Sequence, residues 1–150
     1  MKKVLPFLIA LCLFYSCDDT TSVDCSTVLC AGPATLVFEV LVNGENVFDT
    51  GMMDAEDVSI SGDFPDAFEL QVEESNYNGG TRLLFVEQIQ WEVRNYNFQI
   101  EVNAAQSEAL SVSIQLSDGD CCGGIPQISS YRVNTTTLDN PNQVVTINLQ

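Results

Sequence analysis

The chain has 150 residues, carries a formal net charge of −16 and contains no histidine. A surface this acidic repels phosphate backbones, so nucleic acid is excluded as a partner. Without histidine the chain lacks the commonest general base, the Ser-His-Asp triad and most ligand sets of catalytic zinc. It has no Walker motif or other glycine-rich phosphate loop either. We therefore expect a protein that is not an enzyme and that uses no cofactor.

The first 16 residues have the layout of a secretory signal peptide. Lys2 and Lys3 give a positive start, an apolar run follows over residues 4–15, and the small residue Ser16 precedes a cysteine. The apolar run is shorter than the ~20 residues that a membrane-spanning helix needs. These features predict that residues 1–16 are removed on export; an uncleaved N-terminal anchor is the alternative.

The segment Phe14-Tyr15-Ser16-Cys17 resembles the cleavage site of bacterial lipoprotein precursors. In that family the cysteine thiol receives a diacylglyceryl group, the preceding peptide is cut off, and the new amino group is acylated. Here Phe14 replaces the aliphatic residue that is usual three positions before the cysteine. The resemblance implies that Cys17 is lipidated and that the membrane is a partner through this lipid, since two or more acyl chains make such an attachment stable. A disulfide is the competing role for Cys17.

The acidic pair Asp18-Asp19 directly after this cysteine resembles the surface-export signal of lipoproteins from Bacteroidetes bacteria. The stretch VDCSTVLCAGP further resembles a set of small uncharacterised lipoproteins from those organisms. The resemblance implies a lipid-anchored location at the outer membrane and on the cell surface. The alternative is that Asp18 and Asp19 only solvate a linker. We interpret residues 17–32 as the lipidated cysteine followed by a polar tether.

From residue 33 to residue 150 apolar and polar residues alternate with a period of two. Side chains on a strand point to opposite faces in turn, so this alternation indicates half-buried strands. We expect residues 33–150 to form one domain, an all-β antiparallel β-sandwich of the immunoglobulin-like type with about 7–9 strands. The expected strands cover residues 34–42, 57–60, 68–73, 81–94, 95–102, 109–116, 127–134 and 145–149. The Gly-rich and Asn-rich turns between them are expected at residues 43–45, 61–63, 78–80, 118–120, 123–124 and 140–142.

The long segment 81–94 contains one break in its alternation. Its apolar residues of one parity, which should face the core, are Leu83, Phe85, Ile89, Trp91 and Val93. Glu87 falls on the same side, and a β-bulge or a division into two shorter strands would resolve this conflict. In the segment 109–116, Leu116 is expected to be the last residue that faces the core.

Four cysteines remain once Cys12 and Cys17 are set aside: Cys25, Cys30, Cys121 and Cys122. An even number of cysteines in an exported protein predicts disulfides. A bond between the neighbouring Cys121 and Cys122 would close a strained ring. We therefore expect two bonds that join the Cys25/Cys30 segment to this pair, with the connectivity left open. A Cys₄ zinc site is the alternative, but the spacing does not match its usual ligand pairs and an oxidising export route disfavours it.

Two acidic turns and one aromatic residue are the candidates for ligand binding. Asp54-Ala55-Glu56-Asp57 and Asp118-Gly119-Asp120 could supply oxygen ligands to calcium, although neither matches the EF-hand loop and a plain acidic turn is favoured. Tyr77 lies in a Gly-rich turn and is the aromatic residue that we expect to be exposed and able to stack on a sugar ring. Trp91 and Tyr96 have the parity of core residues.

Three functions are compatible with these features. The leading hypothesis is a non-catalytic, lipid-anchored module of the cell envelope that binds an unknown ligand or has a structural role. The alternative is a carbohydrate-binding accessory lipoprotein, assisted by calcium, whose partner is a glycan or a protein. The third is a small hydrolase that uses two carboxylates, for which the sequence singles out no pair.

Overall fold

The computed structural model describes residues 24–103, 106–138 and 144–149. The expected signal peptide, Cys17 and the acidic pair Asp18-Asp19 lie outside these residues, as does the turn expected at residues 140–142. Within the described residues no helix is long and apolar enough to cross a membrane.

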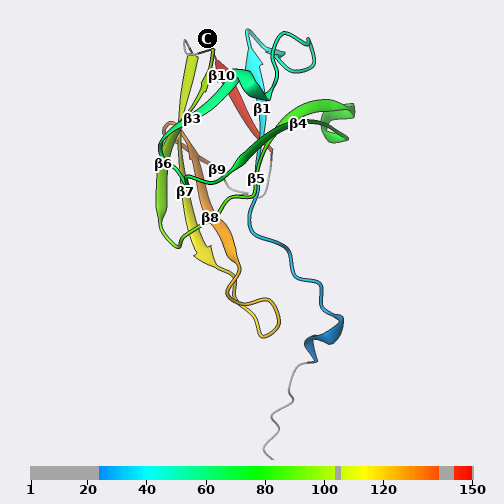
Figure 1. The fold of residues 1–150 in the computed structure, drawn as a ribbon, viewed down its shortest axis with the longest axis vertical. Helices are drawn as coiled ribbons and strands as arrows, with labels where there is room; N and C mark the ends of the chain where they lie inside the picture. Colours follow the sequence, from blue (N-terminus) through cyan, green and yellow to red (C-terminus); the bar gives the residue numbers. More distant parts are fainter. Residues whose placement is uncertain (1–23, 104–105, 139–143, 150) are drawn as a thin grey trace, which may run out of the picture.

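Two five-stranded sheets pack face to face (Figure 1). One sheet has the order β10-β1-β5-β4, with the short β2 paired to β1, and the other has the order β3-β6-β7-β8-β9. Every pairing is antiparallel except that of β1 with β10. The strands are β1 (Leu36–Val42), β2 (Glu45–Asn46), β3 (Val58–Asp63), β4 (Glu69–Ser75), β5 (Thr81–Glu87), β6 (Asn95–Val102), β7 (Gln106–Leu116), β8 (Pro126–Val133), β9 (Thr136–Leu138) and β10 (Val145–Leu149).

The predicted all-β sandwich is confirmed, and its strand order agrees with the immunoglobulin-like type. In an immunoglobulin domain strands B, E and D form part of one sheet and strands C, F and G form the other. Here β1, β5 and β4 take the first three places, and β3, β6 and β7 take the other three. The C-terminal β10 occupies the place of strand A beside β1, but runs parallel to it. The strand count exceeds the expected range because it includes β2 and β9, two very short strands that were not expected.

The alternation that predicted the strands also predicts most of the core. On β6 the residues Tyr96, Phe98, Ile100 and Val102 are all buried, and their neighbours between them are exposed or half-buried. The same holds for the apolar residues of β10. The prediction for Leu116 is wrong, because this side chain lies at the last position of β7, beyond the edge of the core, and is 47% exposed.

The predicted strand 81–94 is corrected to a shorter strand and a loop. β5 ends at Glu87, and the next residue, Gln88, has a φ of 56°. This left-handed residue stops the strand at the position where the alternation breaks. Beyond it the chain is a loop, which buries Ile89 and Trp91 but leaves Val93 exposed, contrary to the prediction.

Within β5 itself the inward parity is opposite to the expected one. Leu84 and Val86 belong to the central hydrophobic cluster. Leu83 is buried but lies outside that cluster, and Phe85 is half-buried. Ile89 and Trp91 share the expected parity, but the turn at Gln88 places them out of phase with the strand.

The turns follow the Asn and Gly residues, with one exception. Asn43 and Gly44 have φ values of 53° and 84° and join β1 to β2 in a tight hairpin, as the Asn-Gly pair predicts. The turn expected at residues 61–63 is wrong, because this segment is the end of β3. Gly62 instead allows β3 and β6 to approach each other closely, since a Cβ at this position would lie 3.1 Å from the Asn97 carbonyl oxygen.

The two ends of the sandwich are built from different loops. One end, which we call the tether end, carries residues 24–35 and the loops 64–68, 88–94 and 117–125. The opposite end carries the loops 43–57 and 76–80. Residues 24–33 are all exposed and run out beyond the sandwich beside the β7–β8 loop (Figure 1).

Candidate functional site

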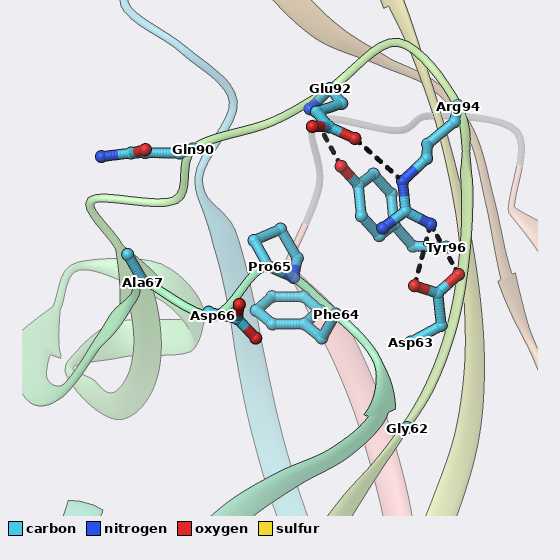
Figure 2. A pocket seen from close by; sticks show the side chains of 10 residues that line it. All are labelled: Gly62, Asp63, Phe64, Pro65, Asp66, Ala67, Gln90, Glu92, Arg94 and Tyr96. Carbon is cyan, nitrogen blue, oxygen red and sulfur yellow. Dashed lines mark hydrogen bonds and ion pairs between the residues drawn. The ribbon is translucent and has the colours of Figure 1, made fainter.

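A pocket of about 490 Å³ opens at the tether end, between the end of β3 and the loop that leads into β6 (Figure 2). The pairing of β3 with β6 brings its two walls together although they are about 30 residues apart in the sequence. The pocket is lined by Gly62, Asp63, Phe64, Pro65, Asp66, Ala67, Gln90, Glu92, Arg94 and Tyr96.

Arg94 is the centre of the polar wall of this pocket. Its Nη1 atom donates to both carboxylate oxygens of Asp63, at 2.8 and 2.6 Å. Its Nε atom lies 3.4 Å from a carboxylate oxygen of Glu92. The guanidinium carbon lies 3.9 Å from the centroid of the Tyr96 ring, within the range of a cation–π contact. Figure 2 shows the arginine held between the two carboxylates and against the ring.

The ion pair fixes the charge state of both partners. The hydrogen bond from Arg94 lowers the pKa of Asp63, and the same bond raises the pKa of Arg94. Asp63 is therefore a carboxylate and Arg94 a cation at neutral pH. Both side chains are about half exposed, so the pair orients the groups and adds little to stability.

Aromatic packing holds the other wall in place. The ring of Phe64 makes edge-to-face contacts with Phe98, Trp91 and Phe68, at centroid distances of 4.6, 5.6 and 5.3 Å. The indole Nε1 of Trp91 donates to the carbonyl oxygen of Ala34 at 2.7 Å. The pocket thus rests on the core and on the first residues of the domain.

Tyr96 connects the pocket to the hydrogen bonding of the backbone. Its side chain is 1% exposed, and its hydroxyl oxygen accepts a hydrogen bond from the backbone N–H of Glu92 at 2.9 Å. A tyrosine near the start of the sixth sandwich strand, bonded to the backbone a few residues upstream, is the tyrosine corner of immunoglobulin-like domains. The predicted burial of Tyr96 and of Trp91 is confirmed.

The chemistry of this pocket suits binding better than acid catalysis. A glycosidase needs one carboxyl group with a raised pKa to act as general acid. The pKa of Asp63 is shifted in the opposite direction, and Glu92 is also engaged by Arg94. What the pocket offers is one cation, the carboxylate of Asp66 and the ring of Phe64, a mixture that can orient a polar ligand.

Of the two acidic turns considered for calcium, the one at residues 54–57 is held by its own contacts. The backbone N–H of Asp54 donates to a carboxylate oxygen of Asp57 at 3.0 Å, and the Asp54 carboxylate lies 3.7 Å from the Arg82 guanidinium. Asp118 and Asp120 are exposed in the β7–β8 loop. In the described part of the chain no three Asp, Glu, Cys or His side chains come together in a way that could hold a metal ion.

Tyr77 differs from its prediction. It lies in the short 3-10 turn between β4 and β5 (Tyr77–Gly79), where its backbone N–H donates to the Ser75 hydroxyl at 3.2 Å. Its side chain is half-buried instead of exposed. The residue is therefore a poor platform for stacking on a sugar ring.

The four cysteines form the two bonds expected from the sequence. Cys25 is joined to Cys121 and Cys30 to Cys122, with Cα atoms 5.2 and 5.4 Å apart. Cys121 and Cys122 lie in the turn of the β7–β8 loop, and each is bonded to a separate partner. The receiving loop is closed by Ser117, whose backbone N–H donates to the Ile125 carbonyl oxygen at 2.8 Å.

Sequence reasoning missed the cluster around Arg94. A weak signal was present, because Arg94 and Tyr96 are two residues apart on an extended segment and so lie on one side. The pairing with Asp63 depends on the register of β3 against β6, which the sequence does not specify.

Comparisons with known proteins identified no relative of this chain. No protein-family model, no curated protein and no solved structure matches the chain.

Proposed function

We propose that the protein is a non-catalytic β-sandwich module of the bacterial cell envelope, held at the outer membrane by lipid on Cys17 and presented at the cell surface. The observation that carries this proposal is the pair of disulfides between residues 24–33 and the β7–β8 loop. Disulfides persist in oxidising compartments outside the cytosol. They tie the domain directly to the segment that follows Phe14-Tyr15-Ser16-Cys17, the stretch that resembles a lipoprotein cleavage site.

The absence of histidine supports a non-catalytic role, because it removes the commonest general base. The module then acts by holding a ligand or by filling a structural position. Its many carboxylates favour a neutral or basic partner over nucleic acid.

Fractionation of cells that produce the full chain tests the anchor. Cys17→Ser removes the acceptor of the lipid, whereas Cys12→Ser changes a cysteine of the expected signal peptide and serves as the matched control. We expect the Cys12→Ser protein to stay in the outer-membrane fraction and to be cut by protease added to intact cells. The Cys17→Ser protein should leave that fraction. Retention of the Cys17→Ser protein in the outer-membrane fraction would contradict the proposal.

A second candidate function is carbohydrate binding. Its candidate site is the pocket around Arg94, which replaces the site expected at Tyr77. The pocket combines an aromatic ring, Phe64, with the hydrogen-bonding groups of Asp66 and Gln90. A glycan array with and without calcium tests it, with Asp66→Asn as the pocket variant and Asp49→Asn, at the opposite end, as its control. Binding that only Asp66→Asn weakens supports a glycan site, and an array without any signal in either condition rejects it.

A further inference from the structure

Leu29 is the most exposed large apolar residue of the described chain, with 98% of its surface accessible. It lies with Val28, which is 44% exposed, in the short loop between Cys25 and Cys30. Both cysteines are bonded to the β7–β8 loop, so this loop is fixed covalently at its two ends. The bonds hold Leu29 out in the solvent, where it has no core to join.

Exposed apolar side chains gather at the same end of the sandwich. Of the five large apolar residues that are exposed in the described chain, four lie at the tether end: Val28, Leu29, Val93 and Leu116. The fifth, Met52, is 64% exposed and lies in the loop 43–57 at the opposite end. The exposed large apolar side chains of the described chain therefore lie mostly on the tether-end face.

The length of chain before Cys25 places this face close to the lipid that we propose on Cys17. Cys25 follows Cys17 by eight residues, and eight extended residues span at most about 29 Å. Without the disulfides, the next contact along the chain between this segment and the sandwich is the bond from the Gln127 amide to the Gly32 carbonyl oxygen. Gly32 follows Cys17 by 15 residues, so that contact would allow a separation of at most about 54 Å. The disulfides therefore shorten the maximum distance between the proposed lipid and the domain, and they attach the chain at the tether end.

The carboxylates nearest the bonded cysteines limit how deeply the loop Cys25–Cys30 can enter a bilayer. Asp118 and Asp120 are exposed beside the bonded cysteines, and Asp24 precedes them on the tether. Hydrogen bonds from Ser26 lower the pKa of Asp24, so it stays charged. Such a surface is repelled by anionic lipid. A shallow position at the headgroup boundary of zwitterionic lipid accommodates both the leucine and the carboxylates.

We propose that the loop Cys25–Cys30 rests on the lipid surface, with Leu29 and Val28 inserted at the boundary between headgroups and acyl chains. The disulfides to Cys121 and Cys122 make this contact rigid and so set the orientation of the domain. This inference rests on the proposed lipid anchor and adds to it a second, side-chain contact with the same membrane.

Fluorescence quenching in vesicles tests the contact with the lipidated, mature protein. Leu29→Trp adds an indole to the loop, and Met52→Trp adds one to an exposed position at the opposite end. The native Trp91 is buried and gives the same background in both proteins. The vesicles are phosphatidylcholine, with or without bromine on the acyl chains. In brominated vesicles we expect Leu29→Trp to lose most of its added emission and Met52→Trp to lose none.

The outcomes separate this inference from the anchor. If the protein floats with the vesicles but Leu29→Trp and Met52→Trp are quenched to the same extent, the loop contact is rejected and the anchor stands. If the protein does not float, both are rejected. Val28→Trp provides a second reporter on the same loop and should be quenched like Leu29→Trp. Replacing Cys30 and Cys122 together by serine should reduce the quenching of Leu29→Trp, because the loop is then held at one end only.

Discussion

The hydroxyl oxygen of Tyr96 lies 2.9 Å from the backbone nitrogen of Glu92 and accepts its hydrogen bond. This bond fixes the loop that follows β5 against the first residues of β6. Glu92 and Tyr96 then flank Arg94, which contacts both side chains and Asp63 on β3. One buried tyrosine thus ties the core of the sandwich to the pocket at its tether end.

Replacing this tyrosine should loosen the loop without disturbing the packing. Tyr96→Phe keeps the ring and its contact with Trp91 but removes the acceptor for the Glu92 N–H. We expect a loss of about 1 kcal/mol in the free energy of unfolding, which is typical of one hydrogen bond. Urea denaturation of the disulfide-bonded protein measures it. An unchanged unfolding midpoint would show that this bond does not hold the loop.

The hydroxyl of Tyr131, unlike that of Tyr96, makes no hydrogen bond in the described structure. This hydroxyl is also buried. Removing an unpaired buried hydroxyl relieves a desolvation cost, so Tyr131→Phe should stabilise the protein by about 1 kcal/mol. The ring keeps its contact with Phe38. Destabilisation of Tyr131→Phe in the same urea experiment would reveal a partner for this hydroxyl.

Burial also makes Tyr131 a source of alkaline instability. Burial raises its pKa in the folded state well above the usual 10.0, so the folded protein keeps the proton that the unfolded chain releases. The stability that this group contributes is present below pH 10 and is lost as the pH rises above it, by up to about 1.4 kcal/mol per pH unit. We expect the free energy of unfolding to fall more steeply between pH 9 and 11 in the wild type than in Tyr131→Phe. Parallel curves would contradict the assignment.

The ion pair of Asp63 with Arg94 should act at the other end of the pH scale. The pKa of Asp63 is lowered in the folded state, so its contribution to stability is present above the usual pKa of 3.8 and is lost as the pH falls through the lowered value. We expect Asp63→Asn to unfold more readily than the wild type at pH 7 and low salt. The difference should disappear at acid pH and shrink in high salt, where exposed pairs are screened. A difference that persists at pH 2 would have to come from another contact.

The two disulfides should contribute unequally when they are removed in turn. Each links residues more than 90 positions apart, and the first bond to close such a loop is worth about 4–5 kcal/mol in the chain-entropy model. Once it is present, the second bond closes a ring of only a few residues and adds about 2–3 kcal/mol. We expect Cys30→Ser with Cys122→Ser to cost far less than replacing all four cysteines. Equal costs per bond in thermal unfolding would argue against this loop-closure account.

The sequence predicted those parts of the fold that depend on local alternation. β6 and β10 were predicted residue by residue, because each has one buried face and no interruption. The phase of Ile89 and Trp91 relative to β5 could not be obtained, since it depends on the left-handed conformation of Gln88, which no Gly or Asn signals. Leu116 was misplaced because alternation does not tell where the opposite sheet ends.

The site was predictable only where covalent chemistry restricts the choice. Four cysteines that form two bonds allow only three pairings, and the observed pairing is one of them. The pocket around Arg94 arises from the register of β3 against β6, a long-range property that the chemistry of the individual residues does not reveal. Gly62, which sequence analysis assigned to a turn, is needed in that register for the close approach to Asn97.

The intact mass of the protein, purified from the membranes of its native host, tests the central claim most directly. We predict a chain that begins at Cys17 and carries the added mass of a diacylglyceryl group on its thiol and of an acyl group on its new amino terminus. The remaining four cysteines should resist alkylation until they are reduced. A chain that retains Met1, or one whose Cys17 is unmodified, would contradict the account of a lipid-anchored envelope module.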